Sequence, residues 1–334
     1  MHPWHRCEQA GDDNGAMSDL NLSAGQGPVD LAQSGCIELP HMGVIRALGA
    51  DAASFLQGQL TQDVALLGSD RAPLAAYCNA KGRMQASFIV VKRSDQEVLL
   101  ICGRDSVAPM VKRLSMFVLR AKVKLSDATD DYRMVGLTGA TVDALQAQAQ
   151  PWNRLDEGDA TVVFLYPGAG VSRACWIAPS GQTPPVGPAV SLAYWHWLSV
   201  RSGLAMVRQA CFEAFVPQML NYESVGGVSF KKGCYPGQEV VARSQFRGTI
   251  KRRAYLVHAS SALSVGQEIF QSDEPEQACG LVAAAAPCPD GQGCDAIVSI
   301  QTSAAQGDGR LHAGDVHGPV LTLLPLPYPL LDDI

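Results

Sequence analysis

The chain has 334 residues, which is enough for two or three domains with cores of their own. Apolar residues make up 47% of it, so it is not disordered throughout, and 32 Gly with 20 Pro argue against a plain helical bundle. The net charge of −6 argues against a protein that coats nucleic acid without sequence preference. No apolar run reaches the ~18 residues that cross a bilayer. We therefore expect a soluble protein without membrane contact or direct nucleic-acid binding.

The N-terminal segment and the cysteines predict the compartment. Arg6 is the only Lys or Arg in the first thirty residues, so residues 1–32 are expected to be a disordered tail and not a targeting signal. Ten irregularly spaced cysteines without a CxxC pair favour a reducing cytoplasm over a disulfide framework. A self-contained zinc or iron–sulfur site of the usual spacing is not expected, and Cys288 and Cys294 are interpreted as surface thiols.

The first elements alternate strands with two helices, which favours an α+β, split βαβ-like layer sandwich. One helix is expected after Asp51, a candidate N-cap, and the other from Ser106, where apolar residues recur at helical spacing. Residues 79–83 contain Asn and Gly and predict a tight hairpin turn. The expected strands are 44–48, 72–78, 84–91, 97–101 and 121–125.

The rest of the chain predicts a second α/β unit and a β-rich end. Strands are expected at 133–137, 161–166 and 172–178 with a helix near 142–148, and a helix at 191–200 ends at Gly203. From residue 254 onward only short strands separated by loops are expected, at 254–258, 267–270, 280–286, 296–300 and 319–324. We divide the chain into a discontinuous domain (33–130 and 188–250), a small ferredoxin-like unit (131–187) and a C-terminal β-barrel (251–334).

Candidate chemistry concentrates around Cys234. The sequence Tyr235-Pro236-Gly237-Gln238 fits a type II turn, and Gly233 removes side-chain bulk before the cysteine. The neighbouring cations favour thiolate over thiol, and a helix beginning at Glu239 would act in the same direction. Cys234 is therefore a candidate nucleophile or metal ligand. The cations are Lys231, Lys232, Arg243 and Arg247.

Other cysteines and the aromatic residues have simpler explanations. Four cysteines lie in apolar strings and are expected to be buried: Cys78, Cys102, Cys175 and Cys211. A Cys-His hydrolase needs an imidazole in hydrogen-bond reach, but no His lies within twenty residues of Cys234, and His196 is expected to be an ordinary helix residue. Trp197 is expected in the core, whereas Trp195, on a different helix face, is the better candidate for stacking on a planar heterocycle.

Positive charge is uneven along the chain. Residues 231–253 carry seven Lys or Arg against Glu239, a local +6, so the remainder sums to −12. A cationic strip on an acidic protein points to a small anionic ligand, while the alternative is a solvated charge run at a domain edge.

Several of these stretches together resemble one family. KKGCYPGQEVVAR, from Lys231 to Arg243, resembles the signature of the YgfZ-type folate-binding proteins, relatives of the aminomethyltransferase (T-protein) of glycine cleavage. GADAASFLQGQLTQDV, CNAKGRM, the stretch from Phe215 to Cys234 and the closing LPLPY also match, so the resemblance covers about residues 36 to 328.

The resemblance implies a ring of three domains around a channel for tetrahydrofolate, and a role in assembly or repair of iron–sulfur enzymes, including tRNA-modifying ones. Cys234 matches the family cysteine, which would transiently ligate an iron–sulfur cluster shared with a client or carrier protein. Trp195 matches a tryptophan that contacts folate in such proteins. Lys232, Arg243 and Arg247 would suit the carboxylates of the folate glutamate tail. The motif positions are Lys232, Gly233, Cys234, Tyr235, Gly237, Gln238 and Glu239.

Three departures weaken the resemblance to the transferases. Arg201 stands where relatives often have Glu, Met42 stands where some members have an aromatic residue, and Asp105 is out of register with a T-protein Asp. The sequence therefore favours a folate-binding accessory factor that acts through Cys234. A folate-dependent aminomethyltransferase or demethylase, and a thiol hydrolase or redox enzyme without folate, remain alternatives.

Overall fold

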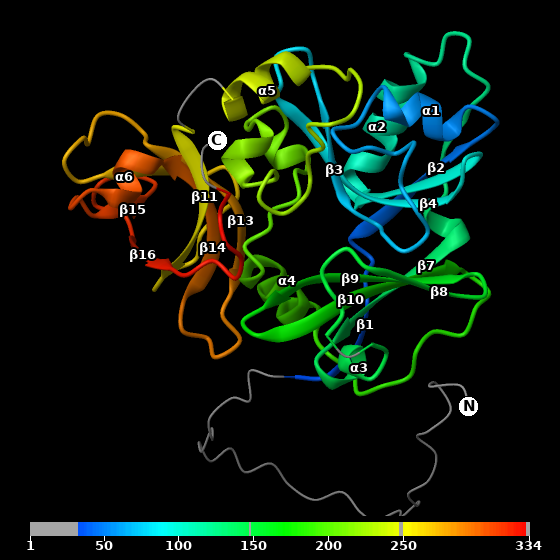
Figure 1. Ribbon diagram of the computed structural model, residues 1–334. Helices are drawn as coiled ribbons and strands as arrows, with labels where there is room; N and C mark the ends of the chain where they lie inside the picture. Colours follow the sequence, from blue (N-terminus) through cyan, green and yellow to red (C-terminus); the bar gives the residue numbers. More distant parts are fainter. Residues whose placement is uncertain (1–32, 147, 247–249, 332–334) are drawn as a thin grey trace, which may run out of the picture.

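Two five-stranded sheets and a closed barrel of six strands make up the fold. The computed structural model describes residues 33–331 except 147 and 247–249, so the predicted tail at 1–32 lies outside the described residues. In Figure 1 the first sheet (blue to cyan), the middle sheet (green) and the barrel (orange to red) occupy three corners of the molecule. The predicted α+β class, three-domain arrangement and C-terminal barrel are confirmed.

The first sheet has the strand order β3-β4-β5-β2-β6, with a core of its own between the sheet and its two helices. Its elements are β2 (Met42–Leu48), α1 (Ala52–Gln57), β3 (Leu74–Cys78), β4 (Met84–Ser94), β5 (Glu97–Gly103), α2 (Arg104–Ser115) and β6 (Lys124–Asp127). Asp51 does not cap α1 as predicted, because its carboxylate accepts the Lys122 amide at 2.6 Å instead. The helix expected from Ser106 begins two residues earlier, at Arg104.

The middle sheet has the order β1-β7-β10-β9-β8, and all its neighbours are antiparallel. Its elements are β1 (Gly35–Glu38), β7 (Tyr132–Thr138), α3 (Ala140–Asp143), β8 (Arg154–Glu157), β9 (Ala160–Gly168) and β10 (Val171–Pro179). The sequence placed residues 35–38 in the first domain. The structure differs, since β1 pairs with β7 from Gly35 opposite Thr138.

The barrel closes in the order β11-β14-β13-β12-β15-β16. Its elements are β11 (Arg252–Ala259), β12 (Glu268–Gln271), β13 (Gly280–Pro287), β14 (Cys294–Gln301), α6 (Thr302–Gln306), β15 (Leu311–Ala313) and β16 (Val320–Leu324). The sequence pattern predicted all of these strands except the three-residue β15. Among the described residues, no helix has the length and apolar character needed to cross a membrane.

The helix α4 (Leu192–Arg201) joins the middle sheet to the barrel, because it packs on β9 on one side and on β13 and β14 on another. Ser191 caps it by accepting the Tyr194 amide at 3.1 Å, and Gly203 follows with φ +67°. The sequence assigned this helix to the first domain, whereas its packing places it between the other two units. The segment after it contains η3 (Gln209–Cys211), η4 (Pro217–Leu220) and α5 (Gln238–Phe246).

Candidate functional site

A cavity of about 330 Å³ lies where the three units meet. Ile89 of the first sheet, Leu165 and Arg173 of the middle sheet, Trp195 of α4 and Ala284 of the barrel all line it. The wall is mostly apolar with a few polar groups, which is typical of small-molecule sites. The position of this cavity matches the central channel that the family resemblance implies.

Trp195 forms part of the cavity wall and is itself well packed. Its side chain is 3% exposed, and the guanidinium of Arg173 lies 4.5 Å from its ring centroid. The ring rests on Gly136 of β7, where an added Cβ would come within 2.7 Å of ring atoms. Gly136 is therefore the small residue that lets Trp195 reach this position.

Arg173 is a buried cation at the same wall. It donates to the hydroxyl of Ser199 at 2.6 Å and to the carbonyl of Tyr166 at 3.4 Å. Within the described part of the chain its Nε has no hydrogen-bond partner, and no carboxylate forms an ion pair with it. Burial lowers the pKa of Arg173 to about 9, so the group is still protonated at neutral pH. A buried charge of this kind is costly unless an anion or polar ligand meets it.

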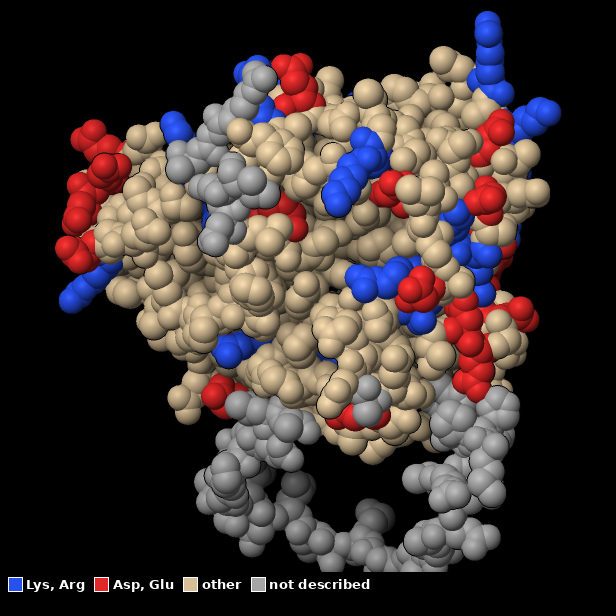
Figure 2. Space-filling model, in the orientation of Figure 1, with Lys and Arg blue, Asp and Glu red and all other residues tan. Residues whose placement is uncertain are grey.

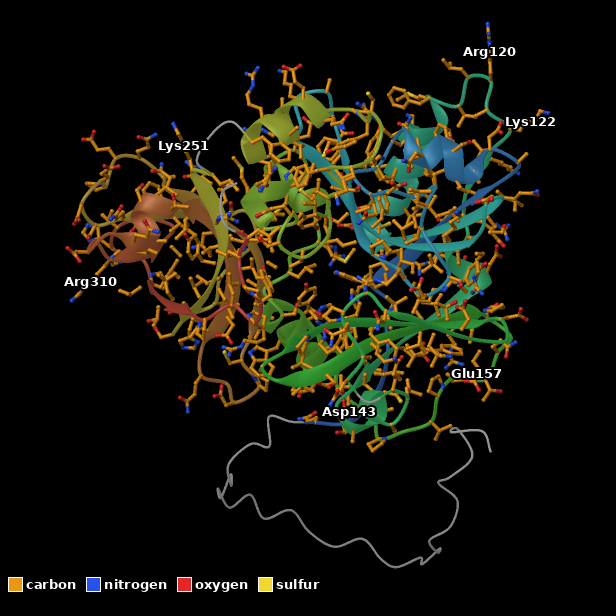
Figure 3. The ribbon with its side chains drawn as sticks, in the orientation of Figure 1. Arg120, Lys122, Asp143, Glu157, Lys251 and Arg310 are labelled. Atoms are coloured by element: carbon orange, nitrogen blue, oxygen red, sulfur yellow. The ribbon has the colours of Figure 1, made fainter. Side chains whose placement is uncertain are left out.

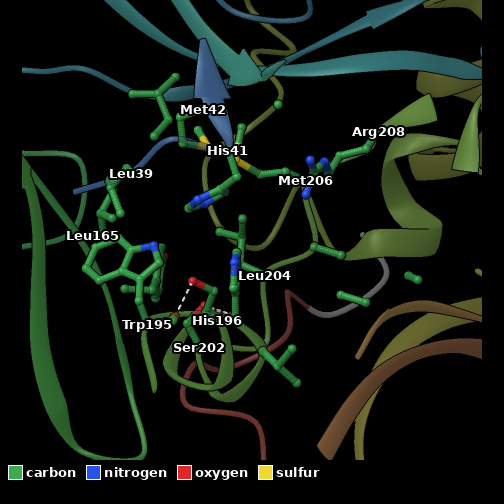
Figure 4. Close-up of a pocket in the computed structure, with 18 of the residues that line it drawn as sticks. Leu39, His41, Met42, Leu165, Trp195, His196, Ser202, Leu204, Met206 and Arg208 are labelled. Atoms are coloured by element: carbon green, nitrogen blue, oxygen red, sulfur yellow. Dashed lines mark hydrogen bonds between the residues drawn. The ribbon is translucent and has the colours of Figure 1, made fainter. Parts of the chain in front are cut away.

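Two histidines in contact with each other form part of the cavity wall. The ring centroids of His41 and His196 are 4.4 Å apart, and Figure 4 shows both beside Trp195. Burial, and then the charges of His196, Arg208 and Arg173, lower the pKa of His41 to about 4. Burial also lowers the pKa of His196. Both rings are thus neutral at neutral pH, and each offers one donor and one acceptor.

His41 also has an unsatisfied atom, because its buried Nδ1 has no partner among the residues that the structure describes. His41 and Arg173 were not among the predicted site residues, and His196 was expected to be an ordinary helix residue. Nothing in the local sequence pattern marks these three polar side chains, or Arg208, as part of one cavity.

Asp105 supplies a carboxylate at the cavity, although the sequence placed it out of register. Its Oδ1 lies 3.4 Å from Nε of Arg208, and both side chains are partly exposed. Met42 also lines the cavity, at the place where an aromatic was expected. Arg201 does not, because its side chain turns to Asp295 at 3.2 Å.

Cys234 is exposed, and the loop that carries it contributes no residue to the cavity wall. The predicted type II turn is present: the Gln238 amide donates to the Tyr235 carbonyl at 3.2 Å, and Gly237 has φ +80°. The helix expected after it is α5. Cys234 forms no hydrogen bond with an imidazole among the described residues, so no Cys-His pair forms there.

Gly237 packs this turn against the hairpin between β3 and β4. An added Cβ would lie 2.4 Å from the carbonyl oxygen of Asn79 and 2.6 Å from the Cα of Gly82. Two stretches that the family resemblance singled out, CNAKGRM and the cysteine signature, are therefore in direct contact. Gly233 is different, since nothing lies within 4 Å of the position of its missing Cβ.

Lys232 was predicted to contact folate, but it does not line the cavity. Its ammonium donates to the carbonyls of Gln57 and of Leu60, the latter at 2.6 Å, and lies 5.1 Å from the ring centroid of Tyr235. Burial lowers the pKa of Lys232 to about 8. Lys232 therefore ties the cysteine loop to the end of α1.

The other predicted folate-tail cations are not at the cavity either. Arg243 is an exposed residue of α5 that lies 3.3 Å from Glu239, and Arg247 lies outside the described residues. Arg173 and Arg208 are the cavity cations instead. They come from other parts of the chain, which explains why the local charge count did not find them.

The predicted cationic strip is not one surface. Arg253 is buried in an ion pair with Glu223 at 2.6 Å, and Arg252 donates to the Cys279 carbonyl at 2.7 Å. On the face in Figure 2, basic side chains are scattered among acidic ones. Figure 3 places Arg120 and Arg310 at opposite ends of the molecule. A long polyanion would find no continuous track on this face.

Comparison with known proteins defines the class. Residues 31–159 match the model of the GCVT N-terminal domain. The crystal structure of the glycine cleavage system aminomethyltransferase T from Bartonella henselae superimposes with a TM-score of 0.65 and 14% identity, over 89% of this chain and 87% of that one. The protein therefore has the aminomethyltransferase fold.

Closer relatives define the family. The tRNA-modifying protein YgfZ of Yersinia enterocolitica is 30% identical over 314 residues, which are 89% of this chain and 93% of the relative. The protein of the same name from Escherichia coli O157:H7 is 29% identical over 84% of this chain and 89% of its own length. The chain belongs to the YgfZ family, as the resemblance of its sequence motifs predicted.

Proposed function

We propose that this chain is a cytoplasmic factor that binds tetrahydrofolate in the cavity between its three units and supports the assembly or repair of iron–sulfur enzymes, including tRNA-modifying ones. Cys234 is the group that meets the client or carrier protein. A reducing compartment suits the nine cysteines of the described residues, all of which are free.

The proposal rests on one observation: an otherwise apolar cavity contains polar groups that lack hydrogen-bond or charge partners among the described residues. Arg173 brings a buried charge without a carboxylate, and Nδ1 of His41 has no partner among the described residues. A reduced folate carries a polar pterin ring and glutamate carboxylates, which together suit these groups. Arg173, His41, His196 and Trp195 would bind and orient the ligand, and the apolar wall would exclude water.

Replacing Trp195 with Phe should weaken tetrahydrofolate binding about tenfold, which corresponds to about 1.4 kcal/mol. The smaller ring withdraws part of the wall and also the surface over which Arg173 lies. Anaerobic calorimetry measures the affinity. Trp176→Phe is the matched control, because Trp176 is equally buried but does not line the cavity. Equal affinities of the two variants would remove Trp195 from the site.

The Cys234 thiol is exposed on a fixed turn, so a client protein can reach it and take part in a reaction step with it. A single thiolate cannot hold a cluster alone, so it would act beside ligands of the client: by completing the coordination of a cluster or by relaying sulfur. Because the loop contributes no residue to the cavity wall, this surface is separate from the folate site.

Replacing Cys234 with Ala should abolish rescue of a strain that lacks the endogenous factor. The readout is the activity of a cluster-dependent tRNA-modifying enzyme, and thermal unfolding should not change because the side chain is exposed. Cys36→Ala provides the control, since Cys36 is also free and half-buried in β1. Full rescue by Cys234→Ala would exclude a role for the thiol.

A second candidate, a folate-dependent aminomethyltransferase or demethylase, is favoured by the carboxylate of Asp105 at the cavity. Such an enzyme needs a carboxylate to position the amine and move a proton. Asp105 is instead engaged by Arg208 at 3.4 Å. Formation of 5,10-methylene-tetrahydrofolate from a methylated amine would decide for this candidate.

A further inference from the structure

Three metal-ligating side chains converge at one end of the barrel, away from the folate cavity. His258 of β11 lies directly opposite Asp295 of β14, and Cys288 follows β13 at the hairpin that leads into β14. Nδ1 of His258 lies 2.8 Å from Oδ1 of Asp295 and 3.8 Å from Sγ of Cys288. All three ligand atoms lie within 4.8 Å of one another.

These distances are close to those of a tetrahedral metal site. With bonds of about 2.0 Å to nitrogen or oxygen and about 2.3 Å to sulfur, tetrahedral ligand atoms lie about 3.3 to 3.5 Å apart. The observed separations of 2.8 and 3.8 Å fall on either side of that range, and the ligand atoms of Cys288 and Asp295 lie within 4.8 Å of each other, so a bound ion would draw the side chains into the tetrahedral arrangement. His258 is 38% exposed, so an ion has a route to the site.

The carboxylate is held in the orientation that a ligand needs. Asp295 is 4% exposed, and its Oδ2 accepts from Nε1 of Trp197 at 2.9 Å and from Arg201 at 3.2 Å. Both donors belong to α4, so Oδ1 remains turned to His258 and Cys288. Metal-ligating carboxylates are commonly fixed by such outer hydrogen bonds.

The same residues do not form a Cys-His-Asp catalytic triad. In a triad the imidazole uses one nitrogen for the nucleophile and the other for the carboxylate. Here Nδ1 of His258 faces both Cys288 and Asp295.

We propose that His258, Cys288 and Asp295 form a binding site for one divalent transition-metal ion of the Zn²⁺ type. Sulfur and imidazole ligands select such ions over Mg²⁺ or Ca²⁺, which prefer oxygen. The ion displaces the thiol proton to solvent, the neutral imidazole carries its proton on Nε2 instead of Nδ1, and the ion is bound by the thiolate, Nδ1 and the carboxylate. The fourth position is left to water or a small ligand. This site is independent of the proposed folate function.

Anaerobic titration of the full chain with Co²⁺ tests the proposal. A Cys234→Ser background removes the exposed thiol, and we expect one equivalent to give a thiolate-to-cobalt absorption band with the visible bands of tetrahedral Co²⁺. Adding Cys288→Ser should abolish the thiolate band, and adding His258→Ala should weaken binding about tenfold or more. Cys279→Ala, another barrel cysteine, is the control that should keep the band.

A second measurement uses the chain without any substitution. Zn²⁺ should slow the alkylation of Cys288 by iodoacetamide, followed by mass spectrometry, without slowing that of Cys234. Absence of a thiolate band in the Cys234→Ser chain, its survival after Cys288→Ser, or no protection of Cys288 by Zn²⁺ would each overturn the proposal.

Discussion

Replacing Glu223 with Gln is expected to lower the free energy of unfolding by about 3 to 5 kcal/mol. Oε1 of Glu223 lies 2.6 Å from Nη1 of Arg253, and the two side chains are 0% and 9% exposed. Arg253 is the second residue of β11 and also donates to the Leu331 carbonyl at 2.9 Å. The substitution removes the negative charge of Glu223 from beside the buried guanidinium, at the junction of the barrel and the segment after η4.

The size of the effect follows from burial. Burial raises the pKa of Glu223, while Arg253, a backbone amide and the Ser224 hydroxyl oppose this rise, and Arg253 opposes it most. Removing one member of a buried pair costs more than the pair itself contributes, because the remaining charge stays desolvated.

Chemical denaturation followed by tryptophan fluorescence measures this difference. Glu239→Gln is the matched control, since Glu239 also pairs with an arginine but is 87% exposed. Exposed pairs of this kind contribute about 0.3 to 0.5 kcal/mol. Equal effects of the two substitutions would show that the Glu223 pair does not hold the barrel to the rest of the molecule.

The parts of the fold that follow local rules could be predicted from the sequence. Pro236 and Gly237 fix the type II turn through their own backbone preferences, and alternating or apolar runs indicated most strands of the three units, although not β1, β8 or β15. The pairing of β1 could not be predicted, because four residues carry no pattern that selects β7 over a strand nearer in sequence. Asp51 has the right type for an N-cap, but a closer amide from Lys122 competes for its carboxylate.

The sequence indicated Trp195 as a site residue but gave no signal for the polar residues that line the cavity with it. Trp195 was found through the family motif, whereas Arg173 and His41 have no distinctive neighbours and gain their roles only when the three units pack together. Lys232 lies two residues from Cys234, so the sequence suggested a shared ligand. Its long side chain instead donates to two carbonyls at the end of α1. These carbonyls belong to residues that lie 175 and 172 positions earlier in the chain.

The barrel cluster illustrates the same limit. Cys288 and Cys294 were interpreted as surface thiols because they flank a loop rich in Pro, Gly and Asp, but Cys288 is half-buried and Cys294 is buried. His258 and Asp295 are brought beside Cys288 by the register of β11 on β14. Strand pairing across the barrel, and not spacing along the chain, creates this group of ligands.

Gly237→Ala is expected to destabilise the cysteine loop and to lower activity while leaving the Cys234 thiol in place. The new Cβ would lie 2.4 Å from the Asn79 carbonyl oxygen, and the backbone at φ +80° disfavours any residue with a side chain. Backbone atoms of the hairpin cannot move aside as a flexible side chain would. We expect a loss of about 1 to 3 kcal/mol in the free energy of unfolding.

Gly233→Ala is the matched control for stability, because it lies in the same loop with nothing within 4 Å of its missing Cβ. Denaturation should separate the two variants, and Gly237→Ala should also fail to restore the tRNA-modifying enzyme in the complementation assay. Since Cys234 is three residues before Gly237, the contact with the β3–β4 hairpin sets the direction in which the thiol is presented. Wild-type stability and rescue with Gly237→Ala would show that the thiol needs no such support.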